Sequence, residues 1–581
     1  MNSTRSCLGI IAMACLLVGF YCCELNHQLY QHKCPFHDSL DYQQQLFRVM
    51  TLSREQGLSV ALHESCFSNS TVCLPYIVAS IVAPFVSPDR LVGVWIQTGW
   101  LLLFLLSLFY YFNSIKALPP KIATLGCLVF LTALCLYFDH GGLSDFRMDL
   151  GLCLTFGIAV CWFLSAMARP AWWRFGMLGL TAGLCCLARG TAPVYLVFTF
   201  APIVAWDFLN AWLSRKSKSK SDSKTPTIAT ASPPMIGTKI RGLTFSASIV
   251  ALVAGWFYVG NFAYLYHYYV VWNTDANAKV PWIDALEHLI HMYNCLGLPI
   301  TAVWMAWSIG ALAVAVRAHG LKAQTALVIR ERDFDLRILW IGLAPTILII
   351  ARRSGMNPFV CMPSIIGLTL FLMLPILKQL KRSESRALIR YCWIVLLIGF
   401  AMSGYRGWRR HQPRTGFNTM KAQAQILDHI ISDSQTRTPT RVRFGTMQLT
   451  ELHTSSLYAI LQYDRDNVQR HLNWVEIEGT RFDHVHVFSK PATADWADVR
   501  GDSDQAKMES LIGKANRELD YLVVPDEETA KHLQATFGQI YINRFLPELR
   551  TKLLAGPWEK VSEAYQVQRQ EYVEIYRRVD E

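Results

Sequence analysis

Two carboxylates, Asp38 and Asp41, follow shortly after the first apolar stretch of the chain, in the polar run from His37 to Tyr42. A carboxylate that the fold places beside a substrate hydroxyl can act as a general base. The same residues also suit a structural role, because an aspartate at the start of a helix can cap its backbone and favour the helix N-terminus. On the sequence alone, both interpretations stay open.

Further ionisable residues lie in short polar segments between apolar runs. Ionisable groups at a membrane surface are costly unless they are paired or functional. One explanation for them is mutual salt bridging with added contacts to lipid headgroups. The other is a site for a phosphorylated lipid, to which carboxylates and guanidinium groups would both contribute. The residues concerned are Asp145, Arg147, Asp149, Arg189, Arg352 and Arg353.

Membrane-spanning helices are the elements that would position these residues. The chain has 581 residues, of which 52% are hydrophobic and only 17% are charged. Apolar runs of about 15 to 20 residues recur along it, the length that bilayer-spanning helices need. We therefore predict a polytopic α-helical membrane protein with about eleven spans between residues 1 and 404.

The basic residues predict how the spans are oriented. The loop from Asn210 to Gly242 contains seven lysines and arginines and a single acidic residue, Asp222, so we expect it in the cytoplasm. The net charge of +12 is explained by such loops and does not imply a nucleic-acid partner. Counting spans from a cytoplasmic N-terminus, with an uncleaved anchor at Cys7 to Cys23, places residues 24–90 in a first outer loop.

The first outer loop is expected to contain two amphipathic elements. Tyr42, Leu46, Val49, Met50 and Ser53 fall on one stripe of a helix that ends near Gly57. The apolar segment from Leu74 to Phe85 is short and contains prolines, so we predict an interfacial helix and no span. The loop's three cysteines, Cys34, Cys66 and Cys73, would allow one disulfide.

A different kind of sequence begins after the last apolar run. Residues 405–581 have short strand-like segments alternating with helical stretches, which predicts an extracytoplasmic α/β domain. Strands are expected at Val442 to Phe444, His484 to Phe488 and Tyr521 to Val524, with a closing hairpin between Tyr565 and Tyr576. Another outer loop, from Tyr264 to Trp282, is rich in aromatic residues and is predicted to form an interfacial belt.

The order of these motifs resembles the GT-C superfamily of polytopic glycosyltransferases, in particular the family of protein O-mannosyltransferases and aminoarabinose transferases. In that family an aspartate in the first outer loop is followed four residues later by a tyrosine, as Asp38 is by Tyr42. A second outer loop ends with an aspartate at the start of the fourth span, matched by Asp149. The run from Gly179 to Leu184, followed by Arg189, is similar to the family's fifth span with its basic residue.

The resemblance implies a reaction and a set of roles. Asp38 would be the general base on an acceptor hydroxyl, which attacks the anomeric carbon of a polyprenyl-phosphate sugar with inversion. Arg189, Arg352 or Arg353 would stabilise the charge on the departing phosphate. Asp149 would orient the acceptor or hold a divalent metal, although no cofactor is firmly implied. Asp41, Tyr42 and Arg147 would contribute to substrate binding.

The partners implied are a polyprenyl-phosphate-linked sugar, membrane lipids, and a lipid, glycan or protein acceptor. The expected location is the bacterial cytoplasmic membrane, with the C-terminal domain outside. The alternative is a transporter or flippase-like protein with an outer sensing or binding domain. Such a protein would have charged residues in the middle of its spans and an internal repeat.

Overall fold

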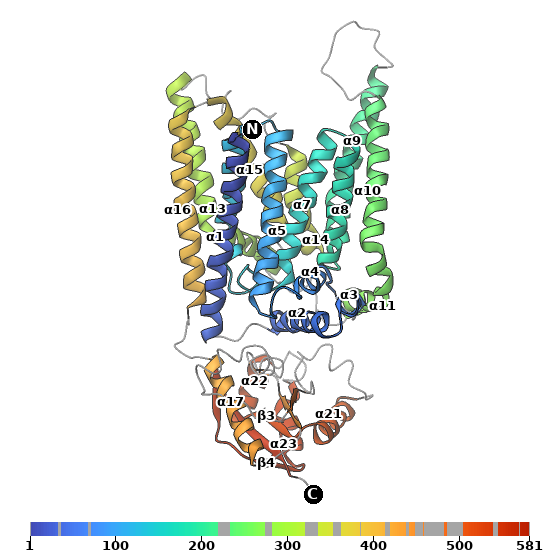
Figure 1. The fold of residues 1–581 in the computed structure, drawn as a ribbon, viewed down its shortest axis with the longest axis vertical. Coiled ribbons are helices and arrows are strands. Elements are labelled where there is room, and N and C mark those ends of the chain that lie inside the picture. Colours follow the sequence, from blue (N-terminus) through green and yellow to red (C-terminus); the bar gives the residue numbers. More distant parts are fainter. Residues whose placement is uncertain are drawn as a thin grey trace. The chain divides into compact units, whose positions relative to one another are not determined.

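The structure is a computed structural model of the chain, whose residues form two compact units (Figure 1). The first unit comprises Met1–Glu24 and Leu46–Arg410, and the second comprises Leu25–Gln45 and His411–Glu581. The residues described are 2–32, 37–67, 71–218, 233–272, 282–319, 335–352, 362–383, 385–412, 419–436, 441–447, 452, 457, 481–484, 503–537, 544–568 and 570–579.

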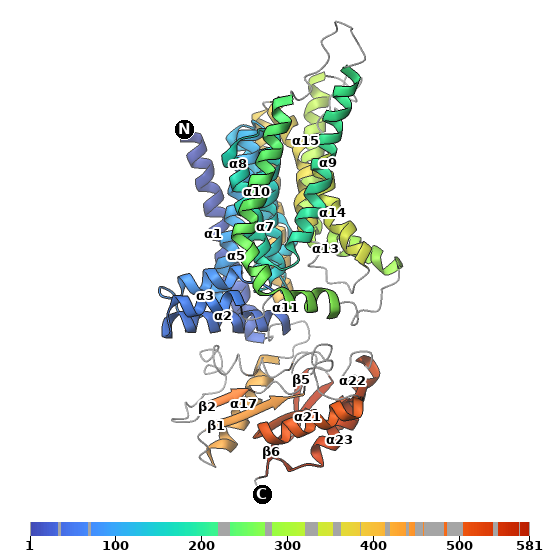
Figure 2. The same ribbon diagram turned by 90° about the vertical axis from the view of Figure 1, so that its right-hand side faces the viewer.

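Long helices that run side by side build the first unit (Figures 1 and 2). They are α1 (Asn2–His32), α5 (Leu91–Tyr110), α7 (Met148–Ala168), α8 (Trp172–Ala188), α9 (Ala192–Lys218), α10 (Pro233–Gly260), α13 (Trp282–His319), α14 (Leu336–Arg352), α15 (Met362–Ser383) and α16 (Arg386–His411). In the described part of the chain, seven helical segments are long and apolar enough to cross a membrane. The polytopic helical fold is thereby confirmed, whereas the expected count of eleven spans remains a prediction.

Three of the predicted spans differ from continuous helices: the third, expected at residues 122–137, the seventh, expected at residues 243–264, and the eighth, expected to end at Arg317. The third begins as α6 (Pro120–Leu128) and continues as two short 3₁₀ turns, Val129–Thr132 and Leu134–Tyr137. The seventh stops at Gly260, before the separate helix α11 (Phe262–Tyr266). The eighth is broken at Gly297, whose φ is +79°, two residues before Pro299. Glycine tolerates this backbone angle and proline lacks an N–H donor, so a break here is favoured.

The segment predicted as the first outer loop, residues 24–90, begins within α1, and its described residues beyond α1 form α2 (His37–Glu55), α3 (Leu58–Phe67) and α4 (Leu74–Val82). Leu46, Val49 and Met50 are fully buried, so the amphipathic stripe predicted for α2 is confirmed. Gly57, with a φ of +95°, provides the left-handed turn after this helix. The hydroxyl of Ser53 donates to the Ser80 carbonyl at 2.8 Å, which joins the second half of α2 to α4. In Figures 1 and 2, α3 lies at the same end of the first unit as α11.

A mixed sheet forms the centre of the second unit, in the strand order β2-β1-β3-β6-β4 with β5 also paired to β6. The strands are β1 (Arg441–Thr446), β2 (Arg481–His484), β3 (Tyr521–Pro525), β4 (Trp558–Lys560), β5 (Tyr565–Gln568) and β6 (Glu571–Arg578). β1 is parallel to β2 and β3, whereas β6 is antiparallel to β3, β4 and β5. The expected closing hairpin is therefore present as β5 and β6.

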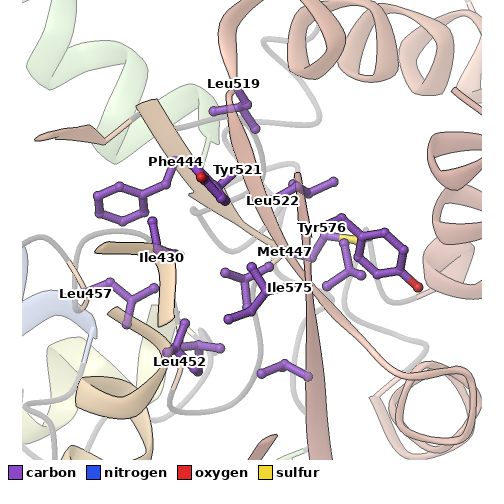
Figure 3. Close-up of a cluster of buried hydrophobic side chains, with 14 of the residues drawn as sticks. Ile430, Phe444, Met447, Leu452, Leu457, Leu519, Tyr521, Leu522, Ile575 and Tyr576 are labelled. Atoms are coloured by element: carbon purple, nitrogen blue, oxygen red, sulfur yellow. The ribbon is translucent and has the colours of Figure 1, made fainter. Parts of the chain in front are cut away.

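Helices accompany the sheet, and apolar side chains fill the space between them (Figure 3). The helices are α17 (Thr419–Gln435), α21 (Asp504–Glu518), α22 (Glu527–Phe537) and α23 (Leu546–Leu554). Phe444 from β1, Leu522 from β3 and Ile575 from β6 are fully buried in one cluster. The α/β prediction is confirmed. Of the strand expected from His484 to Phe488, all residues after His484 lie outside the described residues.

Candidate active site

Two arginines flank one carboxylate at the first turn of α7. The Arg189 Nη1 atom lies 2.9 Å from Asp149 Oδ1, and the Arg147 Nε atom lies 3.4 Å from Asp149 Oδ2. The side chains of Arg147 and Asp149 are 4% and 3% exposed, whereas that of Arg189 is 20% exposed. The structure therefore brings together three of the predicted site residues, which we call the Arg–Asp–Arg cluster.

A tight loop before α7 determines where Arg147 and Asp149 lie. The backbone N–H of Gly141 donates to Asp145 Oδ2 at 2.7 Å, so the buried Asp145 carboxylate holds this loop together. A Cβ atom at Gly142 would lie 2.6 Å from the backbone N and O of Phe138, which leaves room only for glycine. From α5, the Gln97 amide donates to the Arg147 carbonyl at 2.8 Å. Asp145, one of the outer charges in the sequence, therefore has a structural role.

The turn between α8 and α9 carries Arg189, and two other segments hold it in place. The N–H of Gly190 donates to the Thr71 carbonyl at 2.8 Å, and the N–H of Cys73 donates to the Leu187 carbonyl at 3.1 Å. These bonds join the turn to the first outer loop. On its other side, the Tyr258 hydroxyl lies 3.2 Å from the Gly190 carbonyl and 3.0 Å from that of Cys186.

Tyr269 is a residue of this region that the sequence did not indicate. It lies in a short π-helix, His267–Trp272, that follows α11. Burial raises the pKa of Tyr269 to about 12, although the positive charge of Arg189 opposes the rise. The phenol is therefore neutral near pH 7 and lies within the electrostatic reach of the Arg–Asp–Arg cluster. Its place among several similar aromatic residues gave no signal that it differs from them.

The other predicted site residues are described only in part. Asp38 and Asp41 belong to the first two turns of α2, but their side chains lie outside the described residues. Tyr42, on the same helix, is half-buried. Arg352 is the last residue of α14, and its side chain is likewise outside the described part, as is the whole of Arg353. Their proposed roles remain predictions.

The cluster's chemistry favours anion binding. A carboxylate between two guanidinium groups holds them in fixed positions, and a partly exposed guanidinium can donate charge-assisted hydrogen bonds to a phosphate. Each oxygen of the Asp149 carboxylate faces one of these guanidinium groups, so the ion pairs occupy the positions at which a metal ion would bind. Among the residues that the structure describes, His, Cys, Asp and Glu side chains form no group of three that could hold a metal ion.

Comparison with known proteins gives a clear result only at the level of structure. No family model matches the chain, and no curated protein matches its sequence. The structure of ArnT from Cupriavidus metallidurans bound to undecaprenyl phosphate is similar, with a TM-score of 0.53 and 12% sequence identity over 98% of this chain and 97% of that one. ArnT in the apo state gives a TM-score of 0.55 at 11% identity, with 97% of each chain covered. This chain has the ArnT fold.

The likeness to ArnT includes both units, since nearly the whole length of each chain is covered. ArnT is an aminoarabinose transferase of the GT-C type, so the fold that the sequence motifs indicated is confirmed. At 11–12% identity the likeness establishes the fold and assigns no residue of this chain to a role. Roles have to be argued from the Arg–Asp–Arg cluster itself.

Proposed function

We propose that this protein is a membrane glycosyltransferase that moves a sugar from a polyprenyl-phosphate donor to an acceptor hydroxyl on the outer side of the membrane, with inversion at the anomeric carbon. The observation that carries the proposal is the buried Arg–Asp–Arg cluster in a chain with the ArnT fold. ArnT has been seen with undecaprenyl phosphate bound, which supports the same class of lipid here.

The cluster's geometry suggests a division of roles. Arg189 keeps an exposed portion and would donate to the phosphate of the lipid, whereas the more deeply buried Arg147 and Asp149 would hold it in position. As the bond to the sugar breaks, negative charge grows on the phosphate, and a pre-positioned guanidinium stabilises that charge. Asp149 then serves to orient Arg189 and has little capacity left to bind a metal.

The proton of the acceptor hydroxyl needs a separate base. Asp149 is unsuited to this task, because both of its carboxylate oxygens face guanidinium groups and not an open space for an acceptor. Asp38 remains the candidate, as its position after the first span and at the start of an amphipathic helix suggests. The hydroxyl oxygen would form a bond to the anomeric carbon, the bond from that carbon to the phosphate oxygen would break, and Asp38 would take the proton.

The alternative of a transporter places functional charges in the middle of the spans. The ion pairs within the described helical unit do not follow that arrangement. Asp149 is in the first turn of α7, and Asp335 directly precedes α14. Asp207 and Lys239 pair inside α9 and α10, but close to the ends of the apolar segments Ala192–Asn210 and Gly237–Gly260. This observation favours a surface reaction on a lipid over passage through the helices.

Binding of undecaprenyl phosphate to the purified protein in detergent tests the proposal. We expect wild-type protein to bind this lipid and Arg189→Gln to bind it at least about tenfold more weakly, since a charge-assisted hydrogen bond is lost. Arg337→Gln, which changes an arginine paired with Asp335 and Asp207, is the matched control and should bind like wild type. Equal binding by the Arg189 variant and wild type would contradict the proposed phosphate site.

A further inference from the structure

A group of aromatic and arginine side chains lies at the end of the helical unit away from the Arg–Asp–Arg cluster. Asp149 is in the first turn of α7, and Arg189 directly follows α8, so the turn that joins the two helices is at their other end. α7 has 21 residues. At about 1.5 Å per residue it is roughly 30 Å long, the thickness of the hydrocarbon core of a bilayer. The cluster and the turn between α7 and α8 therefore correspond to the two opposite membrane interfaces.

Three aromatic rings from three helices pack together next to this turn. Tyr110, the last residue of α5, stacks on Trp162 of α7, with 5.0 Å between ring centroids and 24° between ring planes. Trp173, in the first turn of α8, meets both rings edge-on, with centroids at 5.7 and 5.6 Å. Trp173 is 51% exposed, so this aromatic platform extends to the surface of the unit.

Arg174 is held in one orientation against the platform. Its Nε atom donates to the Tyr110 hydroxyl at 3.0 Å, and its Nη1 atom donates to the Arg169 carbonyl at 2.6 Å. Its guanidinium carbon lies 4.8 Å from the centroid of a Trp173 ring, a cation–π contact. In the described part of the chain Arg174 makes no further hydrogen bond or ion pair. Its Nη2 group is therefore available to a ligand, in a direction that the two hydrogen bonds determine.

The start of α10 continues this surface. In Figures 1 and 2, α8 and α10 run side by side, and the Ser246 hydroxyl joins them by donating to the Phe175 carbonyl at 2.7 Å. Trp172 and Phe245 meet edge-on at 5.5 Å, and they are 58% and 40% exposed. Arg241 lies one helical turn before Phe245 on the same face of α10. We call the combined surface the Trp–Arg patch, which consists of Arg169, Trp172, Trp173, Arg174, Arg241 and Phe245.

The charges of the Trp–Arg patch are not balanced by the protein. Arg169 and Arg241 are exposed. Among the described residues, no carboxylate pairs with either of them or with Arg174. Positive charge that only orients a membrane protein explains exposed residues such as Arg241. It does not explain why two hydrogen bonds and a tryptophan ring fix the guanidinium of Arg174.

We propose that the Trp–Arg patch binds the headgroup of an anionic phospholipid in the adjacent leaflet. The Nη2 group of Arg174 donates to the headgroup phosphate, and Arg169 and Arg241 add electrostatic attraction. The exposed tryptophan rings favour a membrane lipid over a soluble phosphate, because such rings lie at the level of lipid headgroups. The predicted topology makes this the cytoplasmic leaflet. This lipid is distinct from the donor of the proposed reaction, which would bind at the opposite interface.

Native mass spectrometry of the full-length protein in detergent tests the inference, with phosphatidylglycerol and phosphatidylcholine of the same acyl chains as probes. We expect wild-type protein to bind phosphatidylglycerol at least about fivefold more tightly, the effect of one cation near a charged headgroup. The double variant Arg169→Gln/Arg241→Gln should bind it about ten- to thirtyfold more weakly than wild type and bind phosphatidylcholine equally well. Both side chains are exposed, so this variant should fold normally.

Arg386→Gln/Arg390→Gln is the matched control. It removes the same charge from exposed residues at the start of α16, on the same predicted side of the membrane and outside the patch. Its affinity for phosphatidylglycerol should stay within about twofold of wild type. An equal loss in both double variants would mean general charge attraction and would overturn the inference. Equal affinity of wild-type protein for the two phospholipids would overturn it as well.

Tyr110→Phe tests whether the orientation of Arg174 matters. The variant keeps the ring in the aromatic platform and removes only the hydroxyl that accepts from Arg174 Nε. We expect about threefold weaker binding of phosphatidylglycerol, since the guanidinium is then held by one hydrogen bond fewer. Unchanged affinity would contradict a direct role of Arg174.

Two further probes separate this site from other ligands. Glycerol 1-phosphate is a soluble phosphate ester without acyl chains. If it bound to the patch as tightly as phosphatidylglycerol, a free phosphate would be the ligand and the inference would be wrong. The patch variant should bind undecaprenyl phosphate like wild type, and Arg189→Gln should bind phosphatidylglycerol like wild type. Wild-type protein that bound phosphatidylglycerol selectively but not undecaprenyl phosphate would support the inference and contradict the proposed function.

Discussion

Charged side chains gather at two places in the helical unit, and they are built very differently. At the start of α7, Arg147 and Asp149 are almost fully buried, and Arg189, 40 positions further along the chain, is 20% exposed. At the start of α14, the Arg337 Nε atom lies 2.9 Å from Oδ1 of Asp335, which is two residues earlier in the chain. The Arg337 side chain is 41% exposed. We call this second set, which extends to Lys116, Asp207 and Lys239, the α14 network.

The comparison teaches how to separate a candidate site from a solvated set of ion pairs. Both use arginine and aspartate, and both contain pairs near 3 Å. The difference lies in the backbone: a glycine-requiring loop, a turn and the first outer loop are bonded together around Asp149. Burying Arg147 and Asp149 in this way is costly, so their arrangement calls for a function, whereas a pair made by an arginine as exposed as Arg337 contributes little.

The first prediction is all-or-none and concerns which side of the membrane each region faces. In Ser219→Cys, the new thiol lies in the basic loop after α9 and should react only with reagents that reach the cytoplasm. In Ser503→Cys, at the start of α21, it should react only from outside. Labelling of intact cells with a membrane-impermeant maleimide measures both. The reverse pattern would place Asp38 in the wrong compartment and contradict the proposed reaction.

The second prediction concerns the base. Asp38→Asn should reduce sugar transfer by roughly two to four orders of magnitude with folding intact, because a positioned general base supplies about that much. Transfer from undecaprenyl-phosphate-linked sugars, assayed as release of undecaprenyl phosphate, measures the effect. Asparagine caps helices as well as aspartate does, so a mere helix cap would leave activity unchanged.

Asp41→Asn is the matched control for this substitution, since it makes the same change one helical turn further along α2. Because Asp41 is predicted to bind substrate and not to take the proton, we expect Asp41→Asn to lose far less transfer activity than Asp38→Asn when the substrate is saturating. If Asp41→Asn abolishes transfer while Asp38→Asn remains active, the alignment of the first outer loop with the family is shifted by one turn, and the base is Asp41.

The third prediction breaks the cluster itself. Asp149→Asn removes the charge that separates Arg147 from Arg189 and leaves two buried guanidinium groups facing one another. Loss of one partner of a buried ion pair typically costs about 3 kcal/mol or more, so we expect a lower unfolding temperature together with weakened binding of undecaprenyl phosphate. Differential scanning fluorimetry in detergent measures the first effect. An unchanged unfolding temperature would show that Asp149 does not hold the two arginines.

The sequence predicted much of this arrangement, and its failures have physical causes. Hydropathy located most of the helices, because a span needs a long apolar run wherever it lies. The order of the spans also predicted that Arg147, Asp149 and Arg189 lie on the same side of the membrane. The sequence did not predict that both arginines pair with the same carboxylate. This pairing depends on backbone hydrogen bonds, such as the one from the Gly190 N–H to the Thr71 carbonyl, and no sequence pattern indicates such bonds. Tyr269 was missed for a related reason, since its direction follows from the break after Gly260.

The smallest expected effect comes from the α14 network, whose groups respond to pH. Burial alone would raise the pKa of Asp335, but hydrogen bonds from Arg337 and the charges of Arg337 and Lys116 outweigh it, so the pKa is lowered. A carboxyl group whose pKa is lower in the folded protein stabilises that state at neutral pH, and this contribution disappears as pH falls below the ordinary value near 4.

Asp335→Asn should therefore cost less than about 1 kcal/mol near pH 7, because Arg337 is well exposed and water screens the pair. The difference in unfolding temperature between this variant and wild type should begin to shrink as the pH falls below about 4, and it should vanish only below the lowered pKa of folded Asp335, where the wild-type carboxyl is neutral as well. Asp149→Asn is the contrasting measurement, with a larger loss near pH 7. If Asp335→Asn destabilised the protein as strongly as Asp149→Asn does, the distinction between a costly buried cluster and a solvated network would be wrong.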